Sequence, residues 1–499
     1  MSTPSLSFTG GSLNRMPLGD LIRHHAAIDP EAPLITLEDR VITRAQFEAR
    51  CNRRARLLAH SGVKPDDLVT VALPNGLEFY ETIFAIWKLG ATPNPVSASL
   101  SDHELRGILE VGMPRLVVGI DPVRVPGRSV LLSSPDISGD YSDEYLPSVV
   151  PHYWKAMTSG GSTGRPKLIV DHMQGDWDPT EGGLAQQPGD SILNPGPLYH
   201  NGPFLATMLG MFSGGHVIEM SRFDPVRLLE NIERHRISWL LLVPTMMHRI
   251  ARLPEDQRRA YDVSSLRTVL HTAAPCPVWL KQFWIEWLGP QKMLEVYTGT
   301  ERQALATISG IEALAHPGSV GRIQAGSAIR ILDEDGVDVA PGEVGEIYLR
   351  PDGGRNSTYH YLGAEPRARG EWESLGDLGS IDDRGYLYLS DRRVDLIIRG
   401  GVNIYPAEIE AAIDAHPLVA SSIVIGLPDE DLGQAVHAVV QVPQGTALGE
   451  VELKEFLSQR LSHFKMPKSF EFVRTPLRDD AGKARRSGLR ATRIAQTKN

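Results

Sequence analysis

The chain has 499 residues and a formal net charge of −10, with 41% hydrophobic and 22% charged residues. These proportions are typical of a soluble globular protein and exclude wholesale disorder, the acidic balance argues against a nucleic-acid-binding protein, and the length predicts two or more domains. Two cysteines, Cys51 and Cys276, are too few for a disulfide framework and indicate the reducing cytoplasm, and neither a membrane span nor a secretory signal is readable.

The N-terminal part alternates between strand and helix patterns. Residues 1–16 are polar and rich in glycine and serine, and we predict that they are disordered. Residues 33–62 favour two strands that lead into a helix closed by a glycine. Residues 67–96 favour a strand, an Asn-Gly turn and a second helix.

Apolar runs separated by helical patterns such as residues 224–236 continue the alternation. This order is typical of sheets covered by helices on both faces. The apolar runs are residues 116–120, 129–133, 216–220, 239–244 and 268–274.

After Gly318 the texture changes to short alternating strands and turns, which predicts a strand-rich, partly antiparallel lobe. A new strand, a Gly-Gly turn and a helix started by proline begin near residues 391–395. We therefore predict an N-terminal domain over residues 17–392 and a mobile C-terminal domain over residues 393–499. The fold class is α/β, a large N-terminal domain of packed sheets with a strand-rich lobe, hinged to a small C-terminal α+β domain.

Residues 158–167, TSGGSTGRPK, form a glycine- and hydroxyl-rich stretch. Backbone N–H groups and hydroxyls in such a loop can wrap around phosphate oxygens. The stretch differs from the P-loop of nucleotide hydrolases, because Pro166 precedes Lys167 and an apolar, strand-like run follows. A plain surface loop is the alternative interpretation.

This stretch resembles the glycine-rich signature of the adenylate-forming superfamily, which contains acyl-CoA synthetases, luciferases and the adenylation domains of peptide synthetases. The resemblance implies that ATP and Mg²⁺ activate a carboxylic acid to an acyl-adenylate, with release of pyrophosphate, before the acyl group is transferred. It also implies that Thr163 has a catalytic role. The phosphate-binding residues would be Thr158, Ser159, Gly160, Gly161, Ser162, Thr163, Gly164 and Lys167.

A second motif, VYTGTER, covers residues 296–302. Tyr297 can stack on adenine, Thr298 and Thr300 can hydrogen-bond phosphate or substrate oxygens, and Glu301 can help to hold Mg²⁺. Alone the motif is weak, because a tyrosine and a glutamate four residues apart are common on ordinary strands and helices. Its order and distance behind the glycine-rich stretch favour the functional interpretation.

Two further motifs follow in the order of the superfamily. Asp377 and Arg392 resemble the residues that hold the ribose hydroxyls, although an aspartate in a turn is also a common structural feature. Lys483, behind Gly482, matches the lysine that family members bring to the α-phosphate and the carboxylate during adenylation. A cation delivered there would stabilise the charge that develops in the transition state.

His200 matches a histidine that lines the acyl pocket in many relatives and gates the route of the incoming nucleophile. A lone histidine is more often structural, so this role rests on the resemblance. Its neighbours suggest an apolar slot for an aromatic or medium-sized carboxylic acid. The predicted pocket residues are His200, Asn201, Gly202, Phe204, Ala273, Ala274 and Thr298.

Two positions depart from the family pattern. Thr298 replaces a common glycine, so the pocket should be narrower or more polar there. Val394 stands where the hinge usually has Asp or Lys, which puts the usual domain rotation in doubt unless Asp395 serves instead.

For the second half-reaction the leading acceptor is coenzyme A, presented with the loop of Arg399, Gly400 and Gly401. The tail over residues 460–499 carries eleven Lys or Arg against three acidic residues, and it could meet the nucleotide phosphates or be a solvated end. An amide synthetase, with an amine or amino acid as acceptor, and a catalytically silent nucleotide-binding relative remain the alternatives.

Overall fold

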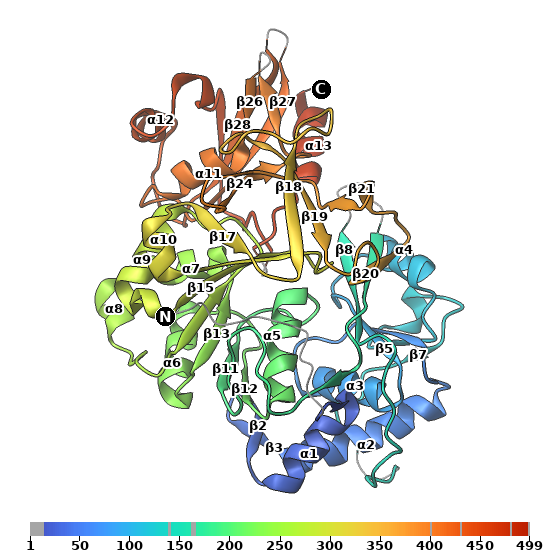
Figure 1. The fold of residues 1–499 in the computed structure, drawn as a ribbon. Coiled ribbons are helices and arrows are strands. Elements are labelled where there is room, and N and C mark those ends of the chain that lie inside the picture. Colours follow the sequence, from blue (N-terminus) through green and yellow to red (C-terminus); the bar gives the residue numbers. More distant parts are fainter. Residues whose placement is uncertain are drawn as a thin grey trace.

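The computed structural model describes residues 14–137, 141–160, 166–399, 402–429, 432–479 and 482–497. A large N-terminal α/β domain carries a smaller C-terminal domain at one end (Figure 1). The predicted fold class is therefore confirmed. Within the described ranges, no helix has the length and apolar character needed to cross a membrane.

The N-terminal segment begins earlier than predicted. Arg15 forms an ion pair of 2.7 Å with Asp176, and Met16 begins β1 (Met16–Pro17), which pairs with β10 (Asp176–Trp177). Residues 14–16 are thus ordered, because a partner far along the chain holds them. Residues 1–13 lie outside the described part of the chain.

A four-stranded parallel sheet has the order β5-β4-β6-β7. Its strands are β4 (Leu68–Val71), β5 (Thr92–Pro95), β6 (Leu116–Val118) and β7 (Val130–Leu131). The predicted Asn-Gly turn is confirmed, since Gly76 caps α3 (Leu77–Lys88). The other helices at this end of the chain are α1 (Leu21–Ile28), α2 (Arg44–His60) and α4 (Asp102–Gly112).

The main sheet has fifteen strands, and its central strands are parallel. The part of this sheet that contains the parallel strands comprises β2 (Pro33–Leu37), β3 (Arg40–Thr43), β11 (Ser191–Asn194), β12 (His216–Glu219), β13 (Trp239–Leu242), β14 (Thr268–His271) and β15 (Met293–Thr298). One face is covered by α3 and α5 (Asn201–Phe212), whose residues share a core with both sheets. The other face is covered by α6 (Pro225–His235), α7 (Pro244–Ala251) and α9 (Val278–Leu288), with the short α8 (Glu255–Arg259) nearby.

The predicted strand-rich lobe is antiparallel and continues the main sheet beyond β15. It has a small core of its own. Its elements are β16 (Leu305–Ser309), α10 (Gly310–Ala315), β17 (Ser319–Ile323), β18 (Ser327–Leu332), β19 (Gly345–Pro351), β21 (Arg367–Arg369), β22 (Trp372–Ser374), β23 (Asp377–Ile381) and β24 (Leu387–Arg392).

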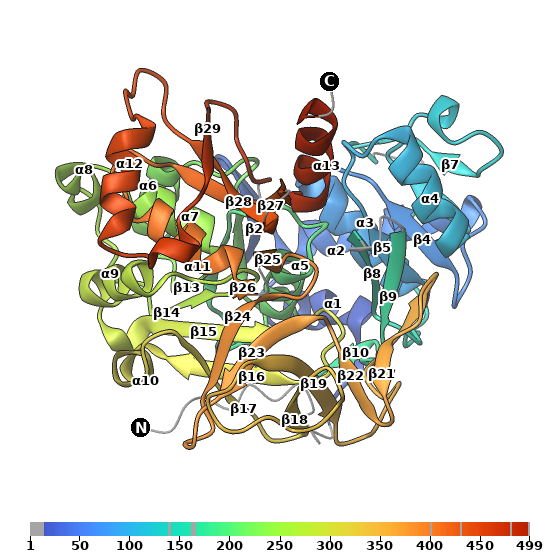
Figure 2. The same cartoon turned by 90° about the horizontal axis from the view of Figure 1, so that it is seen from above.

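The described residues of the C-terminal domain form a five-stranded sheet packed with α-helices (Figure 2). Its core is separate from those of the N-terminal domain, as expected for an independent domain. The elements are β25 (Ile397–Arg399), β26 (Val402–Ile404), α11 (Pro406–Asp414), β27 (Ser421–Asp429), β28 (Gly433–Gln441), α12 (Glu450–Ser458), β29 (Ser469–Val473) and α13 (Arg486–Thr497). The predicted boundary at residue 393 falls between β24 and β25 and stays a prediction.

Arg252 of the N-terminal domain contacts the end of α11. Its guanidinium donates to the carbonyl oxygens of Asp414 at 2.9 Å and His416 at 3.0 Å. A cation at a helix C-terminus is favourable, because unpaired carbonyls and the helix dipole concentrate negative charge there. This contact stabilises the observed orientation of the two domains.

Glu219, at the end of β12, is a buried carboxylate. It accepts hydrogen bonds from the amides of Asn75 and Asn194 and from the Tyr80 hydroxyl. Burial raises the pKa of its carboxyl from 4.5 to about 7, although these donors oppose the shift. Asn75 also holds the segment before His200, because it donates to the Gly196 carbonyl at 2.8 Å.

Replacing Glu219 with Gln is expected to change the stability of the folded protein more favourably at pH 8 than at pH 5. The folded carboxyl has the higher pKa, so the native state binds more protons than the unfolded state between pH 4.5 and about 7, and the wild type loses stability as the pH rises through this window. Glutamine does not titrate. The melting-temperature difference between E219Q and the wild type should therefore grow with pH, and a difference independent of pH would contradict the buried titration.

Candidate functional site

The glycine-rich stretch begins in β8 (Lys155–Gly160) and ends in β9 (Pro166–Asp171), two strands that pair antiparallel. The predicted strand after Lys167 is confirmed. Thr158 accepts a hydrogen bond of 3.1 Å from the Asn94 amide, on the face of the hairpin opposite Lys167. Ser159 and Gly160 extend β8, whereas Gly161, Ser162, Thr163 and Gly164 lie outside the described residues.

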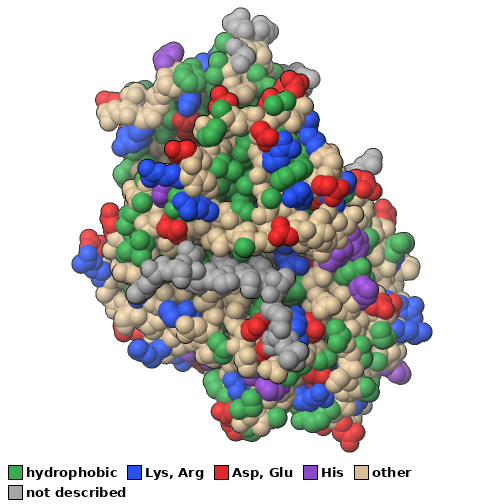
Figure 3. All heavy atoms as spheres, in the orientation of Figure 1, with side chains coloured by type: hydrophobic (Ala, Val, Ile, Leu, Met, Phe, Trp, Pro, Cys, Tyr) green, Lys and Arg blue, Asp and Glu red, His purple; other side chains and the backbone are tan. Residues whose placement is uncertain are grey.

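A third strand, β20 (Tyr359–Leu362), pairs with β9 and adds a tyrosine to the site. Because side chains alternate along strands, Tyr361 lies on the same face as Lys167. Its hydroxyl donates to Glu301 at 2.6 Å, and the Lys167 Nζ lies 3.7 Å from its ring centroid. Figure 3 shows histidine side chains grouped on the molecular surface beside β20.

Lys167 and Glu301 both contact Tyr361 and lie next to each other, with 3.6 Å between Nζ and Oε1. Partial burial lowers the pKa of the Lys167 amine, while Glu301 opposes this shift. A cation beside a carboxylate suits a magnesium triphosphate, since the lysine can bind phosphate oxygens and the carboxylate can ligate the metal. The described residues hold no cluster of three side chains for a metal, so Mg²⁺ would depend on substrate phosphates as well as Glu301.

Removing the Tyr361 hydroxyl is expected to raise the KM for MgATP about tenfold, because the hydrogen bond that orients Glu301 is lost. The phenylalanine ring of Y361F keeps the contact with Lys167. Initial rates at varied MgATP measure the effect. Y359F is the matched control, since the Tyr359 hydroxyl donates to buried Glu373 instead. Equal KM values in Y361F and the wild type would refute the positioning role.

The three predicted nucleoside residues come together at the edge of the lobe. The Tyr297 hydroxyl donates to Asp377 at 2.8 Å, and Arg392 lies 3.3 Å from the same carboxylate. Residues 377 and 392 are direct partners in the β23–β24 ladder. Burial and the Asp377 charge raise the pKa of Tyr297 well above its usual value, so the phenol remains neutral.

The predicted acyl-pocket residues differ in burial and in their partners. His200 precedes α5, and its Nε2 is buried without a hydrogen-bond partner among the described residues. Burial, with a smaller effect of Lys483, lowers its pKa to about 3, so the ring is neutral at physiological pH. Phe204 is fully buried against Trp87 and Trp154 and supports α5 from within the core.

The remaining predicted positions differ in exposure. Ala273 is exposed with a positive φ of 76°, and Ala274 is half-buried. The Thr298 hydroxyl donates to the Ala304 carbonyl at 2.8 Å, so the polar group of this side chain is satisfied by the backbone. Thr300 and Gly202 are half-buried, and a Cβ on Gly202 would meet only Leu241.

Lys483 reaches this region from the C-terminal domain. Its backbone N–H donates to the Asp479 carboxylate at 2.8 Å, which forms a tight turn. The preceding Gly482 packs against α7, where an added Cβ would lie 2.5 Å from the Thr245 hydroxyl. Desolvation lowers the pKa of the Lys483 amine, and the Asp479 carboxylate opposes this shift. Arg392 lowers the pKa further, whereas Glu301 raises it. The lysine therefore shares the electrostatic environment of the ribose and metal residues.

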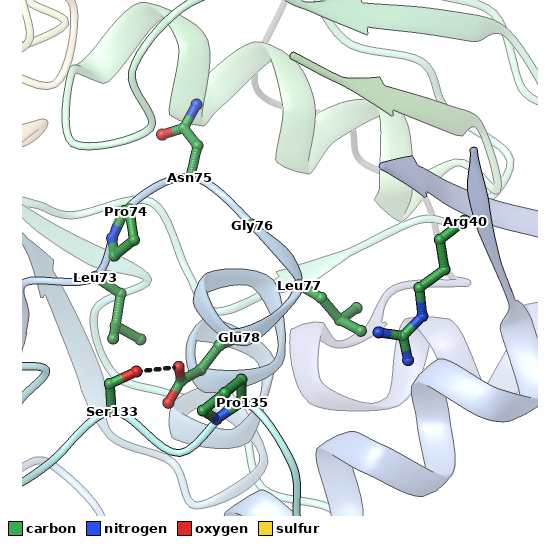
Figure 4. Close-up of a pocket in the computed structure, with 9 residues that line it drawn as sticks. All are labelled: Arg40, Leu73, Pro74, Asn75, Gly76, Leu77, Glu78, Ser133 and Pro135. Carbon is green, nitrogen blue, oxygen red and sulfur yellow. Dashed lines mark hydrogen bonds between the residues drawn. The ribbon is translucent and has the colours of Figure 1, made fainter. Parts of the chain in front are cut away.

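Arg399 does not lie in this group, because its guanidinium donates to the Phe464 carbonyl within the C-terminal domain. Gly400 and Gly401 are outside the described residues. A hollow of about 280 Å³ also lies apart from the site, at the carboxyl ends of β4 and β7 (Figure 4). None of the predicted site residues lines it.

The sequence model of AMP-binding enzymes matches residues 22–358, well over half of the chain. The chain belongs to the AMP-binding enzyme family. The model of the AMP-binding enzyme C-terminal domain matches residues 408–483, which end at Lys483. The predicted membership of the adenylate-forming superfamily is therefore confirmed.

Curated relatives and solved structures agree with this family. A feruloyl-CoA synthase from Amycolatopsis sp is 32% identical over 480 residues, covering 91% of this chain and 95% of the relative. An indoleacetate–CoA ligase from Aromatoleum aromaticum is 30% identical and covers 95% and 98%. The o-succinylbenzoate CoA synthetase of Bacillus subtilis, solved with its acyl-adenylate intermediate, superposes with a TM-score of 0.79 at 26% identity, covering 96% and 98%.

The chain is thus an AMP-forming carboxylic acid ligase. It activates a small carboxylic acid with ATP and Mg²⁺ to an acyl-adenylate and transfers the acyl group to an acceptor, which is coenzyme A in the named CoA ligase relatives. These predictions of activity and cofactors are confirmed. The roles of individual residues remain predictions.

Proposed function

We propose that this AMP-binding enzyme is a coenzyme A ligase for an aromatic or apolar acid of medium size. The observation that carries the proposal is the pair of Lys167 and Glu301, 3.6 Å apart and from distant parts of the chain, with the turn before Lys483 packed against α7 of the N-terminal domain. These three side chains match what the attack of a carboxylate on MgATP requires. We place the reaction in the cytoplasm, because Cys51 and Cys276 are both free.

In the first step a carboxylate oxygen would attack the α-phosphorus of ATP, and pyrophosphate would leave. Lys167 would neutralise charge on the leaving phosphates, Glu301 would help to hold Mg²⁺, which would supply further positive charge there, and Tyr297 and Asp377 would hold the nucleoside. Lys483 would offset the repulsion between the carboxylate and the phosphate oxygens. Thr163, which lies outside the described residues, stays a candidate for the same group.

In the second step the coenzyme A sulfur would attack the acyl carbonyl carbon, and AMP would leave with the bridging oxygen. The C-terminal domain would rotate near residue 393 to withdraw Lys483 and present Arg399 with its two glycines. His200 stays neutral and can act as a hydrogen-bond donor or acceptor beside the pocket entrance. Because the ring is neutral, it would not retain the acyl-adenylate by electrostatic attraction.

The acids in the names of the three relatives support the aromatic class. Ferulate, indoleacetate and o-succinylbenzoate each carry an aromatic ring. The small side chains of Ala273 and Ala274 are compatible with a flat ring near the end of β14. A panel of aryl, fatty and polycyclic acids, scored by pyrophosphate release and then by mass spectrometry with coenzyme A, tests the proposal.

An amide-forming ligase is the second candidate. The observation that favours it is Val394, which is 66% exposed at the predicted hinge and brings no charge to guide a rotation. The same panel run with simple amines distinguishes the two functions. Thioester only in the coenzyme A arm supports our proposal, and amide at low amine excess without thioester overturns it. A silent relative would bind ATP but release no pyrophosphate with any acid.

A further inference from the structure

Three charged side chains meet at the β8–β9 hairpin, two of them fully buried and the third largely so. Lys155 Nζ is 3.0 Å from Asp171 Oδ2, and an Arg302 nitrogen is 2.8 Å from Asp171 Oδ1. The side-chain exposures are 0%, 1% and 15% for Lys155, Asp171 and Arg302. We name these three residues the buried triad. Lys155 and Asp171 are direct ladder partners, so strand pairing itself places them together.

The two ends of the buried triad reach different halves of the active site. Lys155 Nζ donates a hydrogen bond of 2.7 Å to the amide oxygen of Asn201, the first residue of α5 after His200. Arg302 directly follows Glu301 in the chain and has a positive φ of 52°, an uncommon conformation for a residue other than glycine. The buried triad therefore connects the start of the acyl-pocket helix with the metal-binding loop.

The contact with Lys155 fixes the orientation of the Asn201 amide. An ammonium group can only donate, so the amide oxygen must face Lys155 and the NH₂ group must face the other way. Among the described residues, no protein acceptor binds this NH₂ group. The neighbouring His200 Nε2 is buried and also lacks a partner there. The buried His200 nitrogen thus lacks a protein partner in the described part of the chain, and the Asn201 NH₂ beside it is left open to donate to a bound molecule.

Packing alone does not explain the buried triad. Burial disfavours the charged forms of Lys155 and Asp171, and their mutual attraction opposes this in both groups. Arg302 and the Met173 backbone N–H further favour the Asp171 carboxylate, whereas Arg302 disfavours the Lys155 ammonium. Apolar residues at buried ionic positions are often equally stable or more so. The charges therefore point to a role in the site that the triad borders.

We propose that Lys155 is a positioning residue that presents the Asn201 amide NH₂ as a hydrogen-bond donor to an oxygen of the bound acid. Asp171 and Arg302 would in the same way hold Glu301 in position, because Arg302 pairs with Asp171 and directly follows Glu301. Asn201 would thus select acids by a hydrogen bond, while Lys155 acts only through Asn201. The inference rests on the proposed acid ligase function.

A double-mutant cycle of Lys155→Met and Asn201→Ala tests the proposal in the full-length protein. With an accepted acid and saturating MgATP, each single variant should raise the KM for the acid about tenfold, as expected for one lost hydrogen bond. The double variant should be no worse than Asn201→Ala, because Lys155 works through that residue. Additive effects, or a wild-type KM in Lys155→Met, would overturn the proposal.

Asn201→Asp separates the donor role from a purely structural one. A carboxylate keeps the partner of Lys155 and should preserve or raise the melting temperature, but it removes the N–H donors and repels an acid. The KM for the acid should rise at least about tenfold. A KM equal to that of the wild type would show that Asn201 matters only as a partner of Lys155.

Two further variants test the Arg302 end of the buried triad and the general effect of removing a buried charge. Arg302→Gln should raise the KM for MgATP more than that for the acid, and the reverse order would overturn the assignment of that end. Lys88→Met is the matched control, because Lys88 pairs with Glu48 at 2.7 Å and both side chains are 4% exposed. It should lower the melting temperature without changing either KM. Wild-type enzyme that adenylates no acid would instead refute the proposed function.

Discussion

Lys483→Ala is expected to slow acyl-adenylate formation by about 10²- to 10⁴-fold, because it removes the cation that offsets charge at the α-phosphate. The fold should be unaffected, since the Lys483 backbone, not its side chain, makes the bond to Asp479. The same variant should convert added acyl-adenylate and coenzyme A to thioester at nearly the wild-type rate, because that step does not need the lysine.

Single-turnover measurement of pyrophosphate and adenylate separates these two effects. Arg485→Ala is the matched control, since Arg485 is also cationic but is 79% exposed and pairs with Glu104 on the surface. It should behave like the wild type, because exposed ion pairs contribute little. Normal adenylation by Lys483→Ala would remove the lysine from the mechanism.

Glu301→Gln is expected to lower the rate of adenylation about 100-fold and to raise the Mg²⁺ concentration needed for half-maximal activity. Glutamine keeps the size of the side chain and can still accept from Tyr361, but it removes the negative charge that holds the metal and faces Lys167. Titration of activity with Mg²⁺ at fixed ATP measures both effects.

Glu373→Gln serves as its control. Glu373 is a buried carboxylate on β22 and accepts hydrogen bonds from Tyr359 and from Gln303, which follows Arg302 in the chain. Its replacement should reduce stability and leave the Mg²⁺ dependence unchanged. A shift of the Mg²⁺ requirement in both variants would indicate a general disturbance of the loop, and an unchanged requirement in Glu301→Gln would remove the metal role.

The sequence predicted much of the fold because local signals there agree with the tertiary structure. Periodicity and glycine stops placed α2 and α3, and the proline before Lys167 was compatible with the strand β9. Residues 14–16 were predicted wrongly, since their order depends on Asp176, a partner far along the chain. The continuation of the main sheet into the strand-rich lobe was likewise not visible in local patterns.

The candidate site shows the same division. Motifs identified Lys167, Glu301 and Lys483, but no motif pointed to Tyr361 or to the buried triad. Alternation along residues 358–362 could have suggested that Tyr359 and Tyr361 share a face. It could not show that β20 pairs with β9, because pairing between distant strands depends on the whole fold.

The central claim is that the acid is activated as an acyl-adenylate before coenzyme A receives the acyl group. Carboxylic acid labelled with ¹⁸O in its carboxylate, incubated with ATP, Mg²⁺ and coenzyme A, tests it most directly by mass spectrometry. One labelled oxygen should appear in AMP for each thioester formed, because the bridging oxygen leaves with the phosphate. Label in inorganic phosphate together with ADP, or thioester formed without label in AMP, would contradict the account.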